Sequence, residues 1–167
     1  EVTKTHTMSL DTFKSPEFGP IGIVDQDEVI YYHKSSAPTP HIETNQIESD
    51  VHLLKAVSGM DSTILNFLVS QNVKGIVIEA MGRGNVPPLM LEGIKAATEN
   101  KIPVVIVSRC LQGRVLGSYG YLGGGAQLRD MGAILASNLN GQKARIQLML
   151  ALTVSKTTEE LKSYFVD

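Results

Sequence analysis

The sequence predicts an α/β domain built on a parallel β-sheet and preceded by a more irregular N-terminal stretch. Over residues 51–167, apolar runs alternate with amphipathic stretches, whereas residues 1–50 are polar and rich in Thr and Ser. Residues 75–80 and 103–108 are short and apolar almost throughout, as expected for strands buried on both faces. Because strand–helix–strand connections form right-handed crossovers, we expect three layers with about four parallel strands.

The expected elements follow one another at regular spacing. Asp61 or Ser62 is a plausible N-cap for the first helix, and a proline lies near the first turn of the second. The expected strands are residues 51–57, 75–80, 103–108 and 134–136, and the expected helices are residues 62–71, 87–100, 126–131, 142–152 and 157–166. This order is that of a small flavodoxin-like or Rossmann-like domain.

The N-terminal stretch contains a second, smaller pattern. Two β-rich runs, residues 21–24 and 29–33, flank the acidic segment 25–28 and predict a β-hairpin. Residues 35–45 carry Ser, Ala, Thr and Pro and are typical of a linker. We therefore expect a remnant of another domain in residues 1–34, a linker in 35–50 and the main domain in 51–167.

Composition excludes several function classes. The chain has 167 residues with 15 Lys plus Arg, 17 Asp plus Glu and a net charge of −2, so a nucleic-acid partner is not expected. The single cysteine and four widely spaced histidines predict no metal site, and no motif calls for a cofactor. No apolar run approaches the roughly 18 residues that span a bilayer, so no membrane partner is expected. The chain opens on Glu1 without a signal segment; we expect its natural N-terminus to lie upstream, and a cytoplasmic location is favoured over secretion.

The most informative loop follows the strand at residues 75–80. Gly82 and Gly84 allow the backbone to turn sharply, and Asn85 lies where the next helix begins. An amide at that place could bind a polar or anionic substrate group. The alternative is that the glycines only form the turn and Asn85 only caps the helix. The pattern is neither a dinucleotide fingerprint nor a phosphate-binding P-loop.

The loop after residue 108 is long and rich in glycine. Three consecutive glycines, residues 123–125, follow Tyr121 and Leu122 and predict either a mobile lid or a tight turn before a helix. A long connection without a ligand is the alternative. Cys110 is interpreted as a buried apolar filler, since no Cys–His–Asp order supports a thiol nucleophile.

The first strand is a second candidate. Residues 2–7 alternate, so Thr3, Thr5 and Thr7 share one face and Lys4 and His6 the other. A lysine at the end of a buried strand loses its proton more easily, because desolvation disfavours the charged form, and it can then activate a neighbouring Thr hydroxyl. An exposed strand without a catalytic role is the alternative.

Several of these segments, taken in order, resemble the homotetrameric bacterial L-asparaginases of the asparaginase/glutaminase family. The resembling segments are residues 2–7, 11–15, 19–22, 74–78, 82–85, 139–145 and 148–153. Each segment alone is weakly specific, but their order and spacing match along nearly the whole chain.

The resemblance implies an amidohydrolase that needs no cofactor and converts L-asparagine, and often L-glutamine, to the acid and ammonia. Its Thr nucleophile and its Thr-His-Gly-Thr-Asp-Thr motif are absent here, so this chain alone is expected to be inactive. Lys4 falls at the family's catalytic lysine, and Asn85 at an asparagine that enters a neighbouring subunit's active site. We therefore expect Asn85 to point toward a partner chain, supported by Gly82, Gly84 and Tyr121, within a dimer of dimers. Leu122 stands where a carboxylate usually holds the substrate ammonium.

Two other functions remain open. A tRNA-dependent amidotransferase subunit shares the fold and the amide chemistry, but the net charge of −2 and the lack of a further RNA-contacting domain in this sequence argue against it. A non-catalytic flavodoxin-like binding module is the third possibility. Such a module would be monodisperse alone, whereas an asparaginase fragment would expose apolar surface and associate.

Overall fold

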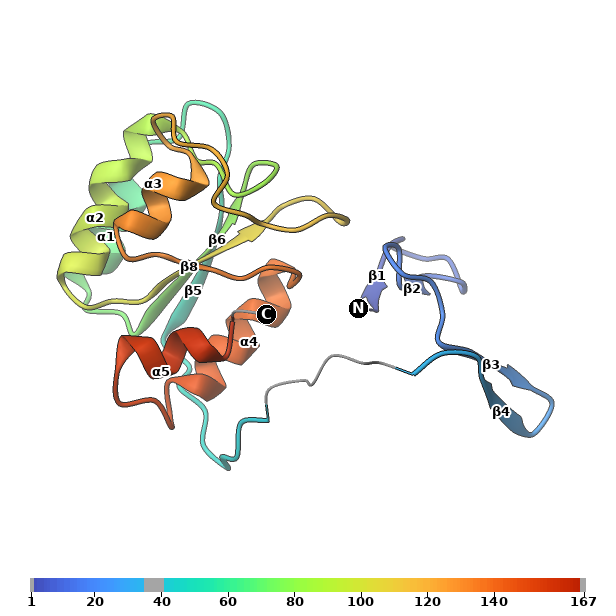
Figure 1. The fold of residues 1–167 in the computed structure, drawn as a ribbon. Coiled ribbons are helices and arrows are strands. Elements are labelled where there is room, and N and C mark those ends of the chain that lie inside the picture. The colour runs from blue at the N-terminus through green and yellow to red at the C-terminus, as the bar shows by residue number, and fades with distance from the viewer. Residues whose placement is uncertain (1, 35–40, 166–167) are drawn as a thin grey trace. The chain divides into compact units, whose positions relative to one another are not determined.

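A computed structural model describes residues 2–34 and 41–165 (Figure 1). The chain divides into two compact units, Glu1–His41 and Ile42–Asp167, and each is described by itself. Most of the Ser-, Thr- and Pro-rich segment, residues 35–40, and the end of the predicted last helix, residue 166, lie outside the described residues.

The first unit consists of two antiparallel strand pairs. Strands β1 (Thr3–Lys4) and β2 (Phe13–Lys14) pair with each other, and β3 (Gly22–Asp25) pairs with β4 (Glu28–Tyr31). The second pair is the hairpin that the sequence predicts, with its strands shifted by about one residue. The pairing of β1 with β2 is not anticipated by the sequence, because both strands are only two residues long.

The second unit contains the predicted parallel sheet. Its strands are β5 (Val51–Lys55), β6 (Gly75–Ala80), β7 (Val104–Ser108) and β8 (Ile134–Leu135), in the order β5-β6-β7-β8. Strand β6 pairs with a neighbour on each side, and five of its six residues are buried. The unbroken apolar run in β6 therefore reports a central strand covered on both faces.

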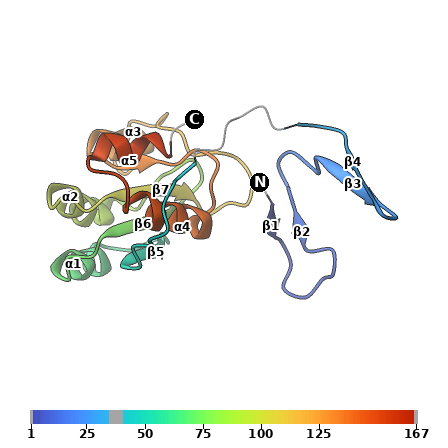
Figure 2. The same cartoon turned by 90° about the horizontal axis from the view of Figure 1, so that it is seen from below.

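Helices cover both faces of this sheet, which confirms the three-layer prediction (Figure 2). Ile76 and Ile78 pack with the helices of one face, whereas Val77 packs with those of the other. The helical elements are α1 (Thr63–Ser70), η1 (Pro88–Met90), α2 (Leu91–Glu99), α3 (Gly125–Asp130), α4 (Gly141–Ala151) and α5 (Thr158–Ser163). Two apolar cores result, one toward α1, α2 and α3 and one toward α4 and α5.

The start of α1 shows a longer-range role for the predicted cap. The Ser62 hydroxyl makes no capping bond to its own helix. It donates to the Leu89 carbonyl at 2.7 Å and accepts the Gly93 amide at 2.9 Å, so it joins α1 to α2. A Cβ on Gly93 would lie 2.6 Å from Leu65 Cβ, which shows how closely these two helices pack.

Candidate functional site

A tight turn follows β6 at the carboxyl edge of the sheet, where ligands of open parallel sheets bind. Met81 and Asn85 form an antiparallel bridge: the Met81 amide donates to the Asn85 carbonyl at 2.8 Å, and the Asn85 amide donates to the Met81 carbonyl at 2.9 Å. Helix η1 starts only at Pro88, after Pro87 at the N-cap position. Asn85 therefore closes the turn and does not cap the helix.

The two glycines of this turn have different structural roles. Gly82 has φ +51°, and nothing lies within 4 Å of where a Cβ would be, so it supplies only a left-handed conformation. Gly84 has φ +108°, and a Cβ there would lie 2.7 Å from Val115 Cγ1. Because Val115 is buried, Gly84 is required both for the backbone angle and for the approach of the next loop.

The end of β7 and the loop that follows it hold the turn through hydrogen bonds. The Ser108 hydroxyl donates to the Gly82 carbonyl at 2.7 Å. Further along, the Leu116 amide donates to the Arg83 carbonyl at 3.2 Å, and the Val86 amide donates to the Gly123 carbonyl at 2.9 Å. These bonds fix the backbone of the turn, and with it the place of the Asn85 Cα.

The side-chain amide of Asn85 is incompletely satisfied. Its Nδ2 donates to the Met81 carbonyl at 3.4 Å, which is long for such a bond. Its Oδ1 is buried and has no hydrogen-bond partner among the described residues. An unpaired buried acceptor costs about 1–3 kcal/mol. In the single chain the amide is therefore folded back onto its turn and held by one long bond; that it points toward a partner chain stays a prediction.

The glycine-rich loop forms a tight turn that leads into α3. Gly124 is the N-cap residue, and Gly125 is the first residue of the helix. The Gly123 amide donates to Gln127 Oε1 at 2.8 Å, an interaction that the sequence does not reveal. Tyr121 and Leu122 are exposed, and the Tyr121 ring lies 5.5 Å from that of Tyr119. The loop thus carries two exposed aromatic rings, and the hydrogen bond from Val86 to Gly123 links it to the Asn85 turn.

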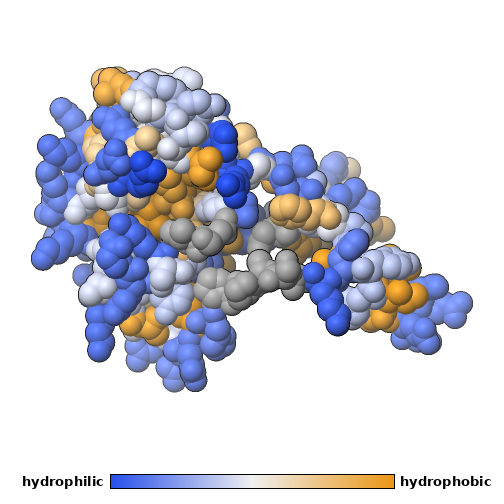
Figure 3. Space-filling model, viewed as in Figure 1, coloured by the Kyte–Doolittle hydropathy of each residue, from blue (hydrophilic) through white to orange (hydrophobic). Residues whose placement is uncertain are grey.

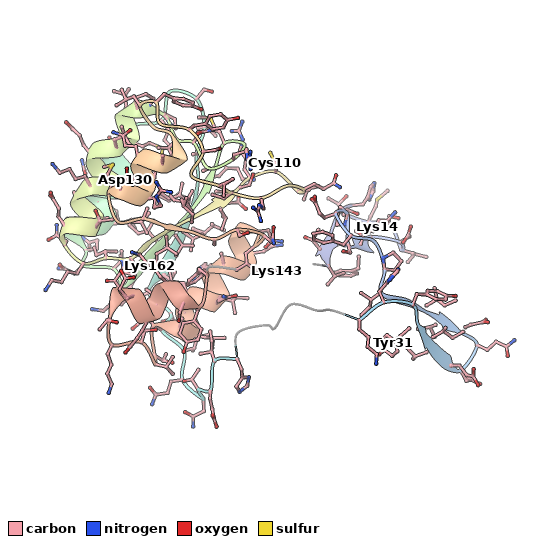
Figure 4. All side chains as sticks on the ribbon, in the orientation of Figure 1. Lys14, Tyr31, Cys110, Asp130, Lys143 and Lys162 are labelled. Atoms are coloured by element: carbon pink, nitrogen blue, oxygen red, sulfur yellow. The ribbon has the colours of Figure 1, made fainter. Side chains whose placement is uncertain are left out.

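The interpretation of Cys110 as a buried filler is wrong, because its side chain is exposed (Figure 4). Strand β7 ends at Ser108, two residues earlier, so Cys110 already lies in the loop beyond the buried part of the strand. The Cys110 amide donates to the Ser108 hydroxyl at 3.1 Å, and the Arg109 guanidinium donates to the Ala56 carbonyl at 3.0 Å. Both bonds serve to anchor this loop.

Lys4 lies in the first unit, at the end of β1, opposite Phe13. The predicted alternation holds over residues 3–6, since Thr3 and Thr5 are half-buried while Lys4 and His6 are exposed. The Lys4 ammonium lies 5.4 Å from the centre of the Phe13 ring. The burial expected around this lysine is therefore not provided by its own unit.

Charged groups near the β6 turn form one pair. Lys55 Nζ lies 3.2 Å from Glu79 Oε2, and Glu79 also packs over the start of α4, where a Cβ on Gly141 would lie 2.6 Å from its carboxylate. Across residues 2–34 and 41–165, no group of three His, Cys, Asp or Glu side chains is placed to hold a metal ion. No helix in those ranges is both long and apolar enough to cross a bilayer.

Comparison with known proteins identifies the family. The glutaminase/asparaginase C-terminal domain matches residues 50–165, and the N-terminal asparaginase domain matches residues 1–37. The chain belongs to the glutaminase/asparaginase family. The two matches cover both of its units, and they bear out the resemblance seen in the sequence.

Relatives within this family carry two kinds of name. A probable L-asparaginase of Deinococcus radiodurans is 37% identical over 98% of this chain and 50% of its own length. An L-asparaginase of Bacillus licheniformis is 32% identical over 98% of this chain and 50% of its own length. A glutamyl-tRNA(Gln) amidotransferase component from Methanopyrus kandleri is 33% identical over 96% of this chain and 36% of its own length. The chain thus spans about half the length of the asparaginases that it matches, or less.

Proposed function

We propose that this chain forms the C-terminal part of an amidohydrolase that converts L-asparagine to L-aspartate and ammonia, without a cofactor. Family membership and the L-asparaginase relatives at 32% and 37% identity support the reaction class. In this proposal residues 1–34 end the N-terminal domain, 35–50 link the two domains and 51–167 form the C-terminal domain. The Thr nucleophile lies outside these 167 residues, so the chain alone has little or no activity.

The buried, unpaired Oδ1 of Asn85 is the observation that carries the proposal. A carbonyl oxygen without a donor is a ready acceptor for an ammonium or amide N–H of the substrate. Its rotamer is held by one long bond, so turning the side chain outward loses little and gives Oδ1 a partner. The hydrogen bonds from the Ser108 hydroxyl and from the Leu116 and Val86 amides keep the Cα in place while the side chain turns.

The remaining candidate residues take roles around this amide. Gly82 and Gly84 form its turn, and Tyr121 adds an exposed aromatic ring on the loop that hydrogen-bonds to that turn through Gly123 and Val86. Leu122 supplies no charge to the substrate ammonium, so the preference between asparagine and glutamine rests on other groups. An uncompensated buried ammonium costs several kcal/mol, and this makes the amide contact more important.

Lys4 is assigned to proton transfer. In the proposed reaction it helps to take the proton from a Thr hydroxyl, whose oxygen then adds to the amide carbon of the substrate. The carbon–nitrogen bond breaks, the nitrogen leaves as ammonia, and water hydrolyses the resulting ester. Lys4 needs a less polar surrounding for this role than its own unit provides, and the rest of the protein would supply it.

The proposed assembly is a dimer of dimers in which Asn85 of one copy enters the active site of another. Large exposed side chains on the loop that carries Tyr121 support an interface there. Tyr121 is 55% exposed and Leu122 61% exposed, and Leu111 is 64% exposed. Aromatic and apolar side chains of this kind are typical of interface cores.

Reconstitution tests the proposal. The chain is mixed, by co-expression, with the N-terminal half of the Deinococcus radiodurans relative, and ammonia release from L-asparagine and L-glutamine is measured. We expect turnover by the mixture and none by either part alone. Turnover by this chain alone would contradict the placement of the nucleophile. An associated mixture that is inactive on both substrates would contradict the amidohydrolase assignment and favour the non-catalytic binding module.

A tRNA-dependent amidotransferase is a second candidate, because relatives with that name match at similar identity. An enzyme of that kind would need to contact tRNA, and the net charge of −2 argues against a strong contact within this chain. Measurement of tRNA binding at low and high salt separates the two. Glutamine hydrolysis that rises only when mischarged tRNA is present would favour the amidotransferase.

A further inference from the structure

A hollow at the edge of the parallel sheet is lined by positively charged side chains that have no role in the proposed hydrolase site. It lies beside the edge strand β8, between α3 and α5, and has a volume of about 450 Å³. Pockets for small ligands fall in the range of about 300–1,000 Å³. Figure 3 views this face and shows hydrophobic side chains between α3 and α5 with hydrophilic ones beside them.

Three cationic side chains line this hollow, each from a different element. Arg114 comes from the loop after β7, Arg129 from the last turn of α3 and Lys162 from α5. None of the described lining residues is acidic. This local positive charge contrasts with the net charge of the whole chain, which is −2. Like charges brought together in one hollow repel each other, so an anion between them is stabilised.

The ion pairs that these cations already make are exposed and neutralise their charge only in part. Arg129 reaches Asp130 only at 3.4 Å, and Asp130 is 71% exposed. Lys162 lies 2.9 Å from Glu159, which is 80% exposed. Such exposed pairs are worth only about 0.2–1 kcal/mol and are exchanged easily for a better anion. Arg114 is exposed and makes no ion pair with any residue in the described ranges. Figure 4 labels Asp130 at the end of α3 and Lys162 on α5.

The floor of the hollow is mostly apolar. Val115 and Ile134 are buried beneath it, and the Val115 amide donates to the Ser137 carbonyl at 3.0 Å. Gly117 has no side chain, which lets the Arg129 guanidinium and Leu135 approach; a Cβ there would lie 3.2 Å from Arg129 Nη1 and 3.3 Å from Leu135 Cδ1. A ligand therefore meets charge at the rim and carbon at the base.

We propose that this hollow binds a small dicarboxylate that lacks an amino group. Guanidinium groups bind carboxylates through paired hydrogen bonds, and the apolar floor accepts a short carbon chain. Two carboxylates match three cations better than one does. An α-ammonium group would be repelled, so the hollow discriminates against amino-acid dicarboxylates such as aspartate. The hollow shares Val115 and Leu116 with the segment that holds the Asn85 turn, but its three cations have no role in the hydrolase proposal, and the inference does not depend on that proposal.

Titration of succinate into the full 167-residue chain tests this proposal, by calorimetry and by ¹⁵N NMR. We expect saturable binding that weakens with salt, with amide shifts centred on residues 114–117 and 133–135. Arg114→Gln and Lys162→Gln should each weaken binding at least tenfold, because each removes a charge-assisted hydrogen bond to a carboxylate. Lys95→Gln, which removes the same charge from the exposed face of α2, should change it less than twofold.

Comparison of ligands gives the outcomes that decide. L-Aspartate should bind at least tenfold more weakly than succinate if the cations select against the ammonium group. Equal binding of inorganic phosphate and succinate would overturn the dicarboxylate assignment and indicate a general anion site. Equal weakening by all three variants, or shifts spread over the whole surface, would show that the charge is only non-specific and would refute the site.

Discussion

Replacement of Gly84 by alanine tests whether the turn is as constrained as the structure indicates. The residue has φ +108°, where an L side chain is strained by about 1–3 kcal/mol, and the new Cβ would lie 2.7 Å from the buried Val115 Cγ1. Overpacking adds about 1–3 kcal/mol, because Val115 is only 3% exposed and has little room to move. We expect Gly84→Ala to lower the free energy of unfolding by about 3 kcal/mol.

Gly82→Ala is the matched control, because it changes the other glycine of the same turn. Its φ of +51° lies in the left-handed region, and nothing lies within 4 Å of the added Cβ, so the loss should be about 1–2 kcal/mol. Urea unfolding followed by far-UV circular dichroism measures both variants. Equal losses for the two variants would refute the packing of Val115 against Gly84, and with it the account of how the turn is held.

Two further substitutions probe how the helices are held at the same edge. Ser62→Ala leaves the Leu89 carbonyl and the Gly93 amide without their buried partner and should lower the free energy of unfolding by about 1–3 kcal/mol. The control Ser70→Ala, at an exposed hydroxyl, should change it by less than about 0.5 kcal/mol. Equal effects of the two substitutions in urea unfolding would contradict the buried link between α1 and α2. The Thr63 backbone amide donates a hydrogen bond to the Asp61 carboxylate and lowers its pKa below 3.8, so the folded pKa lies below the unfolded one. The stability that this carboxylate contributes is therefore present above about pH 4 and is lost as the pH falls through the folded pKa. Asp61→Asn should be less stable than the wild type at pH 6 and equal to it at the lowest pH that keeps the fold. An NMR titration of the Asp61 carboxyl with a midpoint at or above 3.8 would contradict this.

The parallel sheet could be predicted because its strands are recognised from composition alone. Strands β6 and β7 are almost wholly apolar and β-branched, and only a sheet covered on both faces buries such runs. The short pair β1–β2 could not be predicted, since Thr3 meets Lys14 across a loop and the contact depends on the buried Thr12 hydroxyl. Pairing between two-residue strands leaves no periodic signal.

The candidate site could be predicted in place but not in orientation. The glycine spacing located the turn around Asn85, because the backbone angles it needs are those that glycine favours. The position of the Asn85 Cα depends on Ser108 and Val115, which contact the turn from positions distant in sequence, and the direction of its amide depends on the Met81 carbonyl. The exposure of Cys110 likewise depends on where β7 ends, and strand ends are poorly specified by local composition.

Exchange of subunits between two inactive variants tests the central claim that Asn85 of one copy serves the active site of another. Lys4→Met and Asn85→Ala chains are each reconstituted with the N-terminal half of the Deinococcus radiodurans relative, then unfolded together and refolded as a mixture. If Lys4 and Asn85 meet across a subunit boundary, a mixed pair holds one site with both residues intact, and ammonia release should rise well above that of either variant alone. A mixture whose activity equals only the sum of the two separate variants would contradict the account.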